Sequence, residues 1–164
     1  MQEKKKKFNI VDILVILLLV AAIAVVGVKL AGNKVQDAIS KQVTLWAEIE
    51  IEAVPENICE EVFRQNLVGQ KMVSGNEYVS ATVEDVWTED YVHQIETADG
   101  TIVSAVDPSC KNLVLLVKTS VAEGTASPKI GSQELRAGKE FIAKTQGFEM
   151  TGVTRYVEFG EYTK

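Results

Sequence analysis

The strongest constraint on this chain is an apolar run near its amino terminus. Sixteen consecutive residues, from Ile13 to Val28, carry no polar side chain, and the surrounding apolar zone covers residues 10–31. Asp12 and Lys29 interrupt this zone only near its ends, where their side chains reach the headgroups. A helix of that length spans about 33 Å, close to the roughly 30 Å hydrocarbon core of a bilayer. The pattern therefore predicts a transmembrane helix at residues 10–31.

The charges that flank the apolar run predict its orientation. Lys4 to Lys7 are four consecutive lysines immediately before it, whereas the lysines that follow are scattered. The positive-inside rule then places residues 1–9, a basic tail, in the cytoplasm and the carboxyl-terminal residues on the other side of the membrane. A cleaved signal peptide is the alternative, because Ala22-Ile23-Ala24 has the small-x-small pattern of a cleavage site. The apolar run continues past this site to Val28, which favours an uncleaved anchor.

Composition limits what the residues beyond the anchor can be. They number 133, enough for one domain, and carry 12 basic and 21 acidic side chains, a net charge of −9. Nucleic acids and anionic lipid surfaces are bound by basic faces, so this balance argues against both. We expect a tether at residues 32–42 and one extracytoplasmic domain at residues 43–164.

Hydrophobic patterning predicts that this domain is mainly β. Residues 44–53 alternate in polarity, with Trp46, Glu48 and Glu50 on the side expected to face water. Pro55 then opens a short helix that carries Cys59 and is expected to end at Gly69. Further strands are predicted at 71–73, 81–87, 91–96, 101–106, 113–122, 140–144 and 148–159, separated by turn signals such as Asp99-Gly100 and Asp107-Pro108.

The predicted fold is a compact β-barrel-like domain with one short helix, joined to one transmembrane helix. The stretch 113–117 is apolar on both faces, which predicts a central buried strand. A weak internal similarity links residues 67–86 to residues 136–156, with Gly69 and Gly138 at matching positions. It suggests a barrel of two related halves, although chance similarity between valine-rich strands explains it about as well.

The motifs of known catalytic sites are missing from the sequence. It has no glycine-rich phosphate loop, serine elbow, His-Glu-x-x-His or Cys-x-x-Cys, and its one histidine, His93, lies in a strand-like stretch. Two cysteines and one histidine are too few for a zinc site. We therefore expect no enzyme activity, no cofactor and no metal.

Aromatic and cysteine residues are the remaining candidates. Trp46, Trp87 and Tyr91 are candidate ligand-binding platforms, because exposed rings stack on flat ligand faces; packing within the domain is the alternative for the tryptophans. Cys59 and Cys110 both follow the apolar run, where one disulfide is permitted and would stabilise the fold by about 4 kcal/mol; two free thiols are the alternative.

Several short segments resemble one bacterial family. They are Asn9 to Asp12 before the apolar run, residues 43–66, the step Val68-Gly69-Gln70-Lys71, and residues 135–140. Together they resemble the family known as domain of unknown function 4330, which pairs an Asn-x-x-Asp-Leu-like motif and one transmembrane helix with a domain of comparable size. Ile13 stands where leucine is commoner in that motif. The resemblance implies a membrane-anchored envelope protein and carries over no catalytic residue.

These observations predict a function in binding. We expect a non-catalytic, single-span protein of the cell membrane whose extracytoplasmic domain binds an envelope protein or polysaccharide. It would be an accessory to the export or assembly of surface components. The alternative is an envelope hydrolase or transferase that uses acidic residues between Glu84 and Asp90 together with His93.

Overall fold

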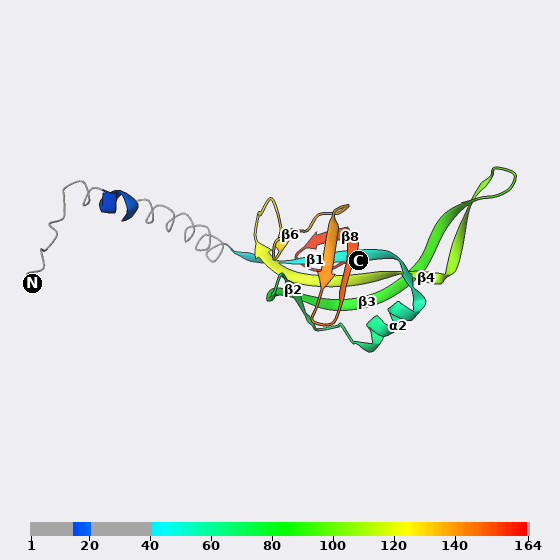
Figure 1. The fold of residues 1–164 in the computed structure, drawn as a ribbon, viewed down its shortest axis with the longest axis horizontal. Coiled ribbons are helices and arrows are strands. Elements are labelled where there is room, and N and C mark those ends of the chain that lie inside the picture. Colours follow the sequence, from blue (N-terminus) through cyan, green and yellow to red (C-terminus); the bar gives the residue numbers. More distant parts are fainter. Residues whose placement is uncertain (1–14, 21–40, 164) are drawn as a thin grey trace, which may run out of the picture. The chain divides into compact units, whose positions relative to one another are not determined.

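The computed structural model describes residues 15–20 and 41–163 (Figure 1). Residues 15–20 are helical, and Lys41–Lys164 form a separate compact unit. The predicted basic tail at 1–9, most of the transmembrane segment at 10–31 and most of the tether at 32–42 lie outside the described residues. Within the described ranges, no helix combines the length and the apolar character needed to cross a bilayer.

The compact unit is built mainly from antiparallel strands. Six of them form one sheet in the order β2-β3-β4-β1-β8-β7, and a two-stranded ribbon, β5-β6, is separate from it. The sheet curves into a nearly closed barrel, because β2 and β7, the outermost strands in this order, approach each other. The predicted mainly β, barrel-like fold with one short helix is confirmed. The elements are β1 (Gln42–Pro55), α2 (Glu56–Arg64), β2 (Lys71–Ser74), β3 (Glu77–Glu96), β4 (Ile102–Ala122), β5 (Lys129–Ile130), β6 (Gln133–Glu134), β7 (Glu140–Lys144) and β8 (Glu149–Phe159).

Strands β1 and β4 form the centre of the sheet. They pair from Gln42 opposite Ala122 to Pro55 opposite Cys110, and their inward side chains fill the barrel core. Residues 113–117 are buried on both faces, as predicted. One expectation for β1 is wrong: Glu48, expected to face water, is 0% exposed because other side chains cover it.

Helix α2 is shorter than predicted. Pro55 precedes it, Glu56 lies in its first turn and Arg64 in its last, each favourable for the helix dipole. It ends at Arg64 rather than at Gly69, because the chain turns back to bury Leu67 in the core.

Strands β3 and β4 are longer than predicted. The predicted strands 81–87 and 91–96 merge into β3, and 101–106 and 113–122 merge into β4. The expected turn at Asp107-Pro108 is wrong. Pairing jumps from Val92–Val106 to Asp90–Lys111, so the proline sits in a bulge, where its missing N–H costs no ladder bond. Strands β5 and β6, of two residues each, are too short for periodicity to reveal.

The two hairpins at opposite ends of the sheet order begin alike. The N–H of Gly69 donates to the carbonyl of Val83 at 2.7 Å, and the N–H of Gly138 donates to that of Thr154 at 2.7 Å. Both glycines have a positive φ, of 83° and 82°, which a side chain would strain. This shared backbone feature accompanies the predicted similarity, and descent from related halves stays a prediction.

Candidate functional site

The two tryptophans named from the sequence lie on the same outer face of the sheet. Trp46 is on β1, and Trp87 on β3 pairs with Val114, which in turn pairs with Glu50 of β1. Both indole N–H groups are used within the chain: Trp46 donates to the carbonyl of Gly160 at 3.0 Å, and Trp87 donates to Glu89 at 2.8 Å. These contacts match the packing alternative, and a ligand-binding role for either ring stays a prediction.

An ion pair network that includes the buried Glu48 joins this face together. Arg155, at a bulge in β8, donates through Nε to the buried Glu48 at 2.7 Å and through its other two nitrogens to Glu89 at 2.8 and 2.7 Å. Hydrogen bonds to Glu89 first, and then to Glu48, hold the pKa of Arg155 above its usual value. We call Trp46, Glu48, Trp87, Glu89, Arg155 and Tyr162 the Arg155 cluster.

The carboxyl-terminal residues close over the Arg155 cluster. The Tyr162 hydroxyl donates to Glu48 at 2.7 Å, and the centroids of the Tyr162 and Trp46 rings lie 5.5 Å apart. Burial, and next the hydrogen bond to Glu48, raise the pKa of Tyr162 to about 12. The guanidinium is thus surrounded by acids of its own chain, so the cluster fixes the end of the chain to the sheet. Alternation alone gave no sign of this network, because Arg155 is isolated in the sequence.

The acidic residues proposed for a hydrolase are spread along β3. Glu89 bonds to Arg155, Asp90 pairs with Lys111 at 2.8 Å, and Glu84 accepts from Thr82 at 2.8 Å. Within the described ranges, no group of three or more histidine, cysteine or acidic side chains is arranged to hold a metal. The hydrolase alternative gains no support from this geometry and stays a prediction.

Tyr91 and His93 lie side by side farther along β3. Their rings are stacked with centroids 5.7 Å apart, and Nδ1 of His93 is buried without a hydrogen-bond partner among the described atoms. Through Lys118 of β4, Trp46 is aligned with Thr82 of β3, well before Tyr91 along that strand. The structure therefore does not bring Tyr91 together with the two tryptophans in one site.

Cys59 and Cys110 are free thiols in the structure. Cys59 is buried in α2, and Cys110 is partly exposed on β4. Burial, and then the negative charges of Glu56 and Cys110, raise the pKa of Cys59. The disulfide allowed by the sequence is not formed here, and pairing under oxidising conditions stays a prediction.

The far half of the β3-β4 hairpin forms an arm, which we define as residues 91–109. Figure 1 shows it extending beyond the rest of the sheet. Its strands pair with each other from Val92–Val106 to Glu96–Ile102, and no third described strand joins them there. Apolar side chains are exposed on both of its faces: Ile102 is 65% exposed, and Val92, Ile95, Val103 and Val106 are also exposed. The predicted turn at Asp99-Gly100 closes the arm.

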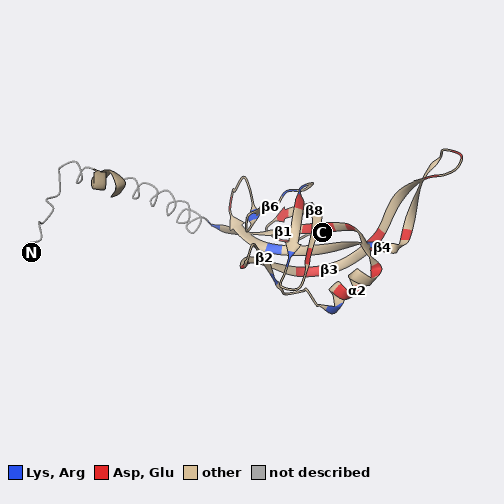
Figure 2. Cartoon of the chain, viewed as in Figure 1, with Lys and Arg blue, Asp and Glu red and all other residues tan. Residues whose placement is uncertain are grey.

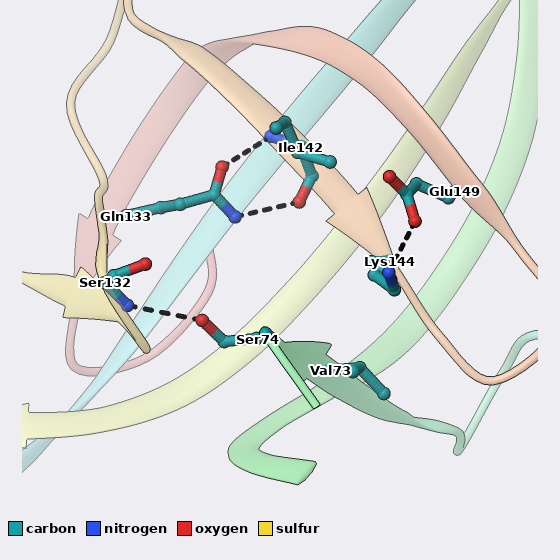
Figure 3. A pocket seen from close by; sticks show the side chains of 8 residues that line it. Val73, Ser74, Ser132, Gln133, Ile142, Lys144 and Glu149 are labelled. Atoms are coloured by element: carbon teal, nitrogen blue, oxygen red, sulfur yellow. Dashed lines mark hydrogen bonds and ion pairs between the residues drawn. The ribbon is translucent and has the colours of Figure 1, made fainter. Parts of the chain in front are cut away.

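A second open feature lies where the barrel fails to close, between the free edges of β2 and β7. We call it the gap; it holds a cavity of about 230 Å³ (Figure 3). Val73, Ser74 and Gly75 line it from β2 and its turn, and Ile142 and Lys144 line it from β7. Lys144 pairs with Glu149 at 2.6 Å at one end.

The β5-β6 ribbon bridges the gap through side chains. The Gln133 amide accepts from the N–H of Ile142 at 2.8 Å and donates to its carbonyl at 3.0 Å, as Figure 3 shows. On the other side, the N–H of Ser132 donates to the Ser74 hydroxyl at 3.4 Å. Sequence reasoning missed Gln133, because a lone glutamine near a short turn belongs to no motif.

Comparison with known proteins places the chain in a family. No curated protein and no solved structure matches it. The sequence profile described as Domain of unknown function (DUF4330) matches residues 2–158, nearly the whole chain. The chain belongs to the DUF4330 family, as its resemblance predicted.

Proposed function

We propose that this protein is a membrane-anchored, non-catalytic binding module of the bacterial cell envelope. In this proposal residues 10–31 are the transmembrane anchor, the amino terminus is cytoplasmic, and the β domain is extracytoplasmic. The protein acts as an accessory to the export or assembly of surface components. The sequence supports the anchor through its apolar run and preceding lysines.

The arm is the observation that carries the binding role. A two-stranded hairpin is marginally stable alone in water, and the arm has no described layer over either face. Val92, Val106 and Ile102 share one face, whereas Ile95 and Val103 share the other. Exposed apolar side chains gathered on one element are typical of a surface that is buried in a complex.

Charge indicates what kind of partner the arm fits. Residues 91–109 contain Glu96, Asp99 and Asp107 but no lysine or arginine, and Figure 2 shows no blue along the arm. Anionic lipid and the arm of a second copy would both be repelled. The best match is an envelope protein with an apolar groove bordered by lysine or arginine.

Photocrosslinking in living cells tests the arm. A photoreactive residue at Ile102 should give one discrete protein adduct, whereas the same residue at Phe63, which is 47% exposed on α2 outside the arm, should not. Reversing the charges of Glu96, Asp99 and Asp107 to lysine should weaken the Ile102 adduct. Equal adducts at both positions, or no effect of charge reversal, would contradict the proposal.

Cysteine labelling tests the topology. Because Cys110 is partly exposed, a membrane-impermeant maleimide should label it in intact spheroplasts, with Cys59→Ser present to remove the other thiol. Labelling of Cys110 only after lysis would place the domain in the cytoplasm and overturn the envelope assignment.

A further inference from the structure

The gap leaves one edge of β7 without a paired strand among the described residues. Strand β7 is hydrogen-bonded to β8 on one side, and its other side faces the gap. The N–H and carbonyl of Ile142 point to that side, as their bonds to Gln133 demonstrate. Since successive residues of a strand alternate, the backbone groups of Glu140 and Lys144 are directed to the same side. Exposed edges of this kind pair readily with another extended chain.

The Gln133 side chain imitates such a pairing. A primary amide carries the donor and the acceptor of a peptide group, and Gln133 uses both on Ile142, as one residue of an adjacent strand would. The Gln133 side chain therefore forms the two hydrogen bonds that one residue of an added strand would form with Ile142. This arrangement identifies the chemistry that the edge accepts: a polypeptide backbone in extended conformation.

Release of Gln133 requires no unfolding. The ribbon that carries it is held by Ile130 and Leu135, which are 3% and 1% exposed, and Gly131 packs against Ser74 so closely that a Cβ would lie 2.2 Å from the hydroxyl. A rotamer change of Gln133 frees the Ile142 backbone, and the ribbon then shifts to admit an added strand, because β6 already contacts β7 and a paired strand needs about 4.8 Å beside it.

We infer that the gap is a site for β-strand addition, in which an extended segment of a partner protein pairs with β7 at Glu140, Ile142 and Lys144 and displaces the Gln133 amide. Five residues of β7 offer an edge of about 17 Å. The cavity of about 230 Å³ accommodates a side chain of the added strand rather than a folded ligand. Main-chain hydrogen bonds supply the affinity in this mode of recognition.

This site is separate from the arm and does not depend on the proposed envelope function. The two are distinguished by variants that change one feature alone. Gln133→Ala alters the gap and leaves the arm unchanged, and Gln42→Ala, at an exposed position at the start of β1, serves as the matched control.

The test uses the 164-residue chain in detergent micelles and a synthetic peptide, acetyl-Lys-Thr-Val-Thr-Val-Thr-Lys-amide, labelled for fluorescence anisotropy. Gln133→Ala should bind the peptide about tenfold more tightly than the unaltered chain, because two competing hydrogen bonds are gone. Gln42→Ala should bind like the unaltered chain. The same peptide N-methylated at alternate residues should bind at least tenfold more weakly.

Hydrogen exchange measured by mass spectrometry locates the peptide. Bound peptide should slow exchange in residues 139–145 and leave the arm unchanged. Unchanged or weaker binding by Gln133→Ala, equal binding of the N-methylated peptide, or protection confined to the arm would overturn the inference. Protection of residues 139–145 that rises with protein concentration in the absence of peptide would also overturn it, because a second copy would then fill the gap.

Discussion

Replacing Arg155 with methionine tests whether the buried Glu48 carboxylate depends on its cation. Glu48 is 0% exposed, and Arg155 Nε lies 2.7 Å from one of its oxygens. Methionine keeps much of the apolar stem of arginine and removes the charge. The variant therefore leaves an acid in the sheet without its principal counter-charge.

The expected cost follows from the burial of each partner. Breaking a fully buried ion pair costs about 3–5 kcal/mol. The Arg155 side chain is 21% exposed, so we take the lower end, about 3 kcal/mol, for its contact with Glu48. The contact with Glu89, whose side chain is 42% exposed, adds at most about 1 kcal/mol.

Urea denaturation followed by circular dichroism measures this loss. With an m-value of roughly 1.5 kcal/mol per M, this loss of about 3–4 kcal/mol should lower the unfolding midpoint by about 2–2.7 M. Arg64→Met is the matched control, because Arg64 is 77% exposed and its pair with Glu61 lies on the surface of α2. The reasoning is refuted if Arg155→Met costs no more than this control.

A second substitution separates charge from packing. In Glu48→Gln/Arg155→Met the buried acid is replaced by a neutral amide that still accepts a hydrogen bond from Tyr162. We expect this double variant to recover about 2 kcal/mol relative to Arg155→Met. No recovery would mean that lost packing, rather than an unpaired charge, causes the destabilisation.

Three further predictions concern pH and close packing. Hydrogen bonds from Lys139, Ser127 and Arg136 lower the pKa of Glu134 to about 2. The ionised Glu134 therefore stabilises the fold fully above about pH 4.5, and this contribution disappears as the pH falls towards 2. The stability advantage of the unaltered chain over Glu134→Gln should vanish across that window, and an advantage that persists at pH 2 would contradict this. The pKa of Tyr162, about 12, exceeds that of a free tyrosine. The contribution of the Tyr162 hydroxyl to stability is therefore present below about pH 10 and is lost as the pH rises through 12. The difference in tyrosinate absorbance between the unaltered chain and Tyr162→Phe should have its midpoint near pH 12, and a midpoint near 10 would contradict this. A Cβ at Gly152 would lie 2.4 Å from the carbonyl oxygen of Glu50, so Gly152→Ala should cost about 1–3 kcal/mol in urea denaturation, clearly more than Thr151→Ala at the exposed neighbour.

Sequence reasoning succeeded where one local pattern controls one element. Alternation in residues 44–53 correctly placed Leu45, Ala47 and Ile49 in the core, and the apolar stretch 113–117 correctly indicated a central strand. These patterns are dictated by burial of each strand's own side chains. The hairpin turn at Asp99-Gly100 was found for the same reason, since turn chemistry is local.

The sites could not be predicted in this way because they are assembled from distant residues. Alternation predicts Glu48 in water, whereas its burial is stabilised by Arg155 and Tyr162, more than a hundred positions later. The role of Gln133 depends on its hydrogen bonds to Ile142, which form where the curvature of the sheet brings β2 and β7 together. The sequence divides β3 and β4 into two strands each. In β4 the division falls at Asp107-Pro108, because a proline normally ends a strand, whereas here a bulge accommodates it.

The central position of β1 has a mechanical consequence. The described domain begins at residue 41, just before β1, and the arm leaves the sheet beyond the opposite end of that strand, where Pro55 pairs with Cys110. Tension between residue 41 and the tip of the arm would act along β1 and β4, perpendicular to their hydrogen bonds. The hydrogen bonds would then be loaded together in shear, instead of breaking one after another as in peeling. A domain pulled between residue 41 and its arm should therefore withstand a higher force than one pulled between residue 41 and β7.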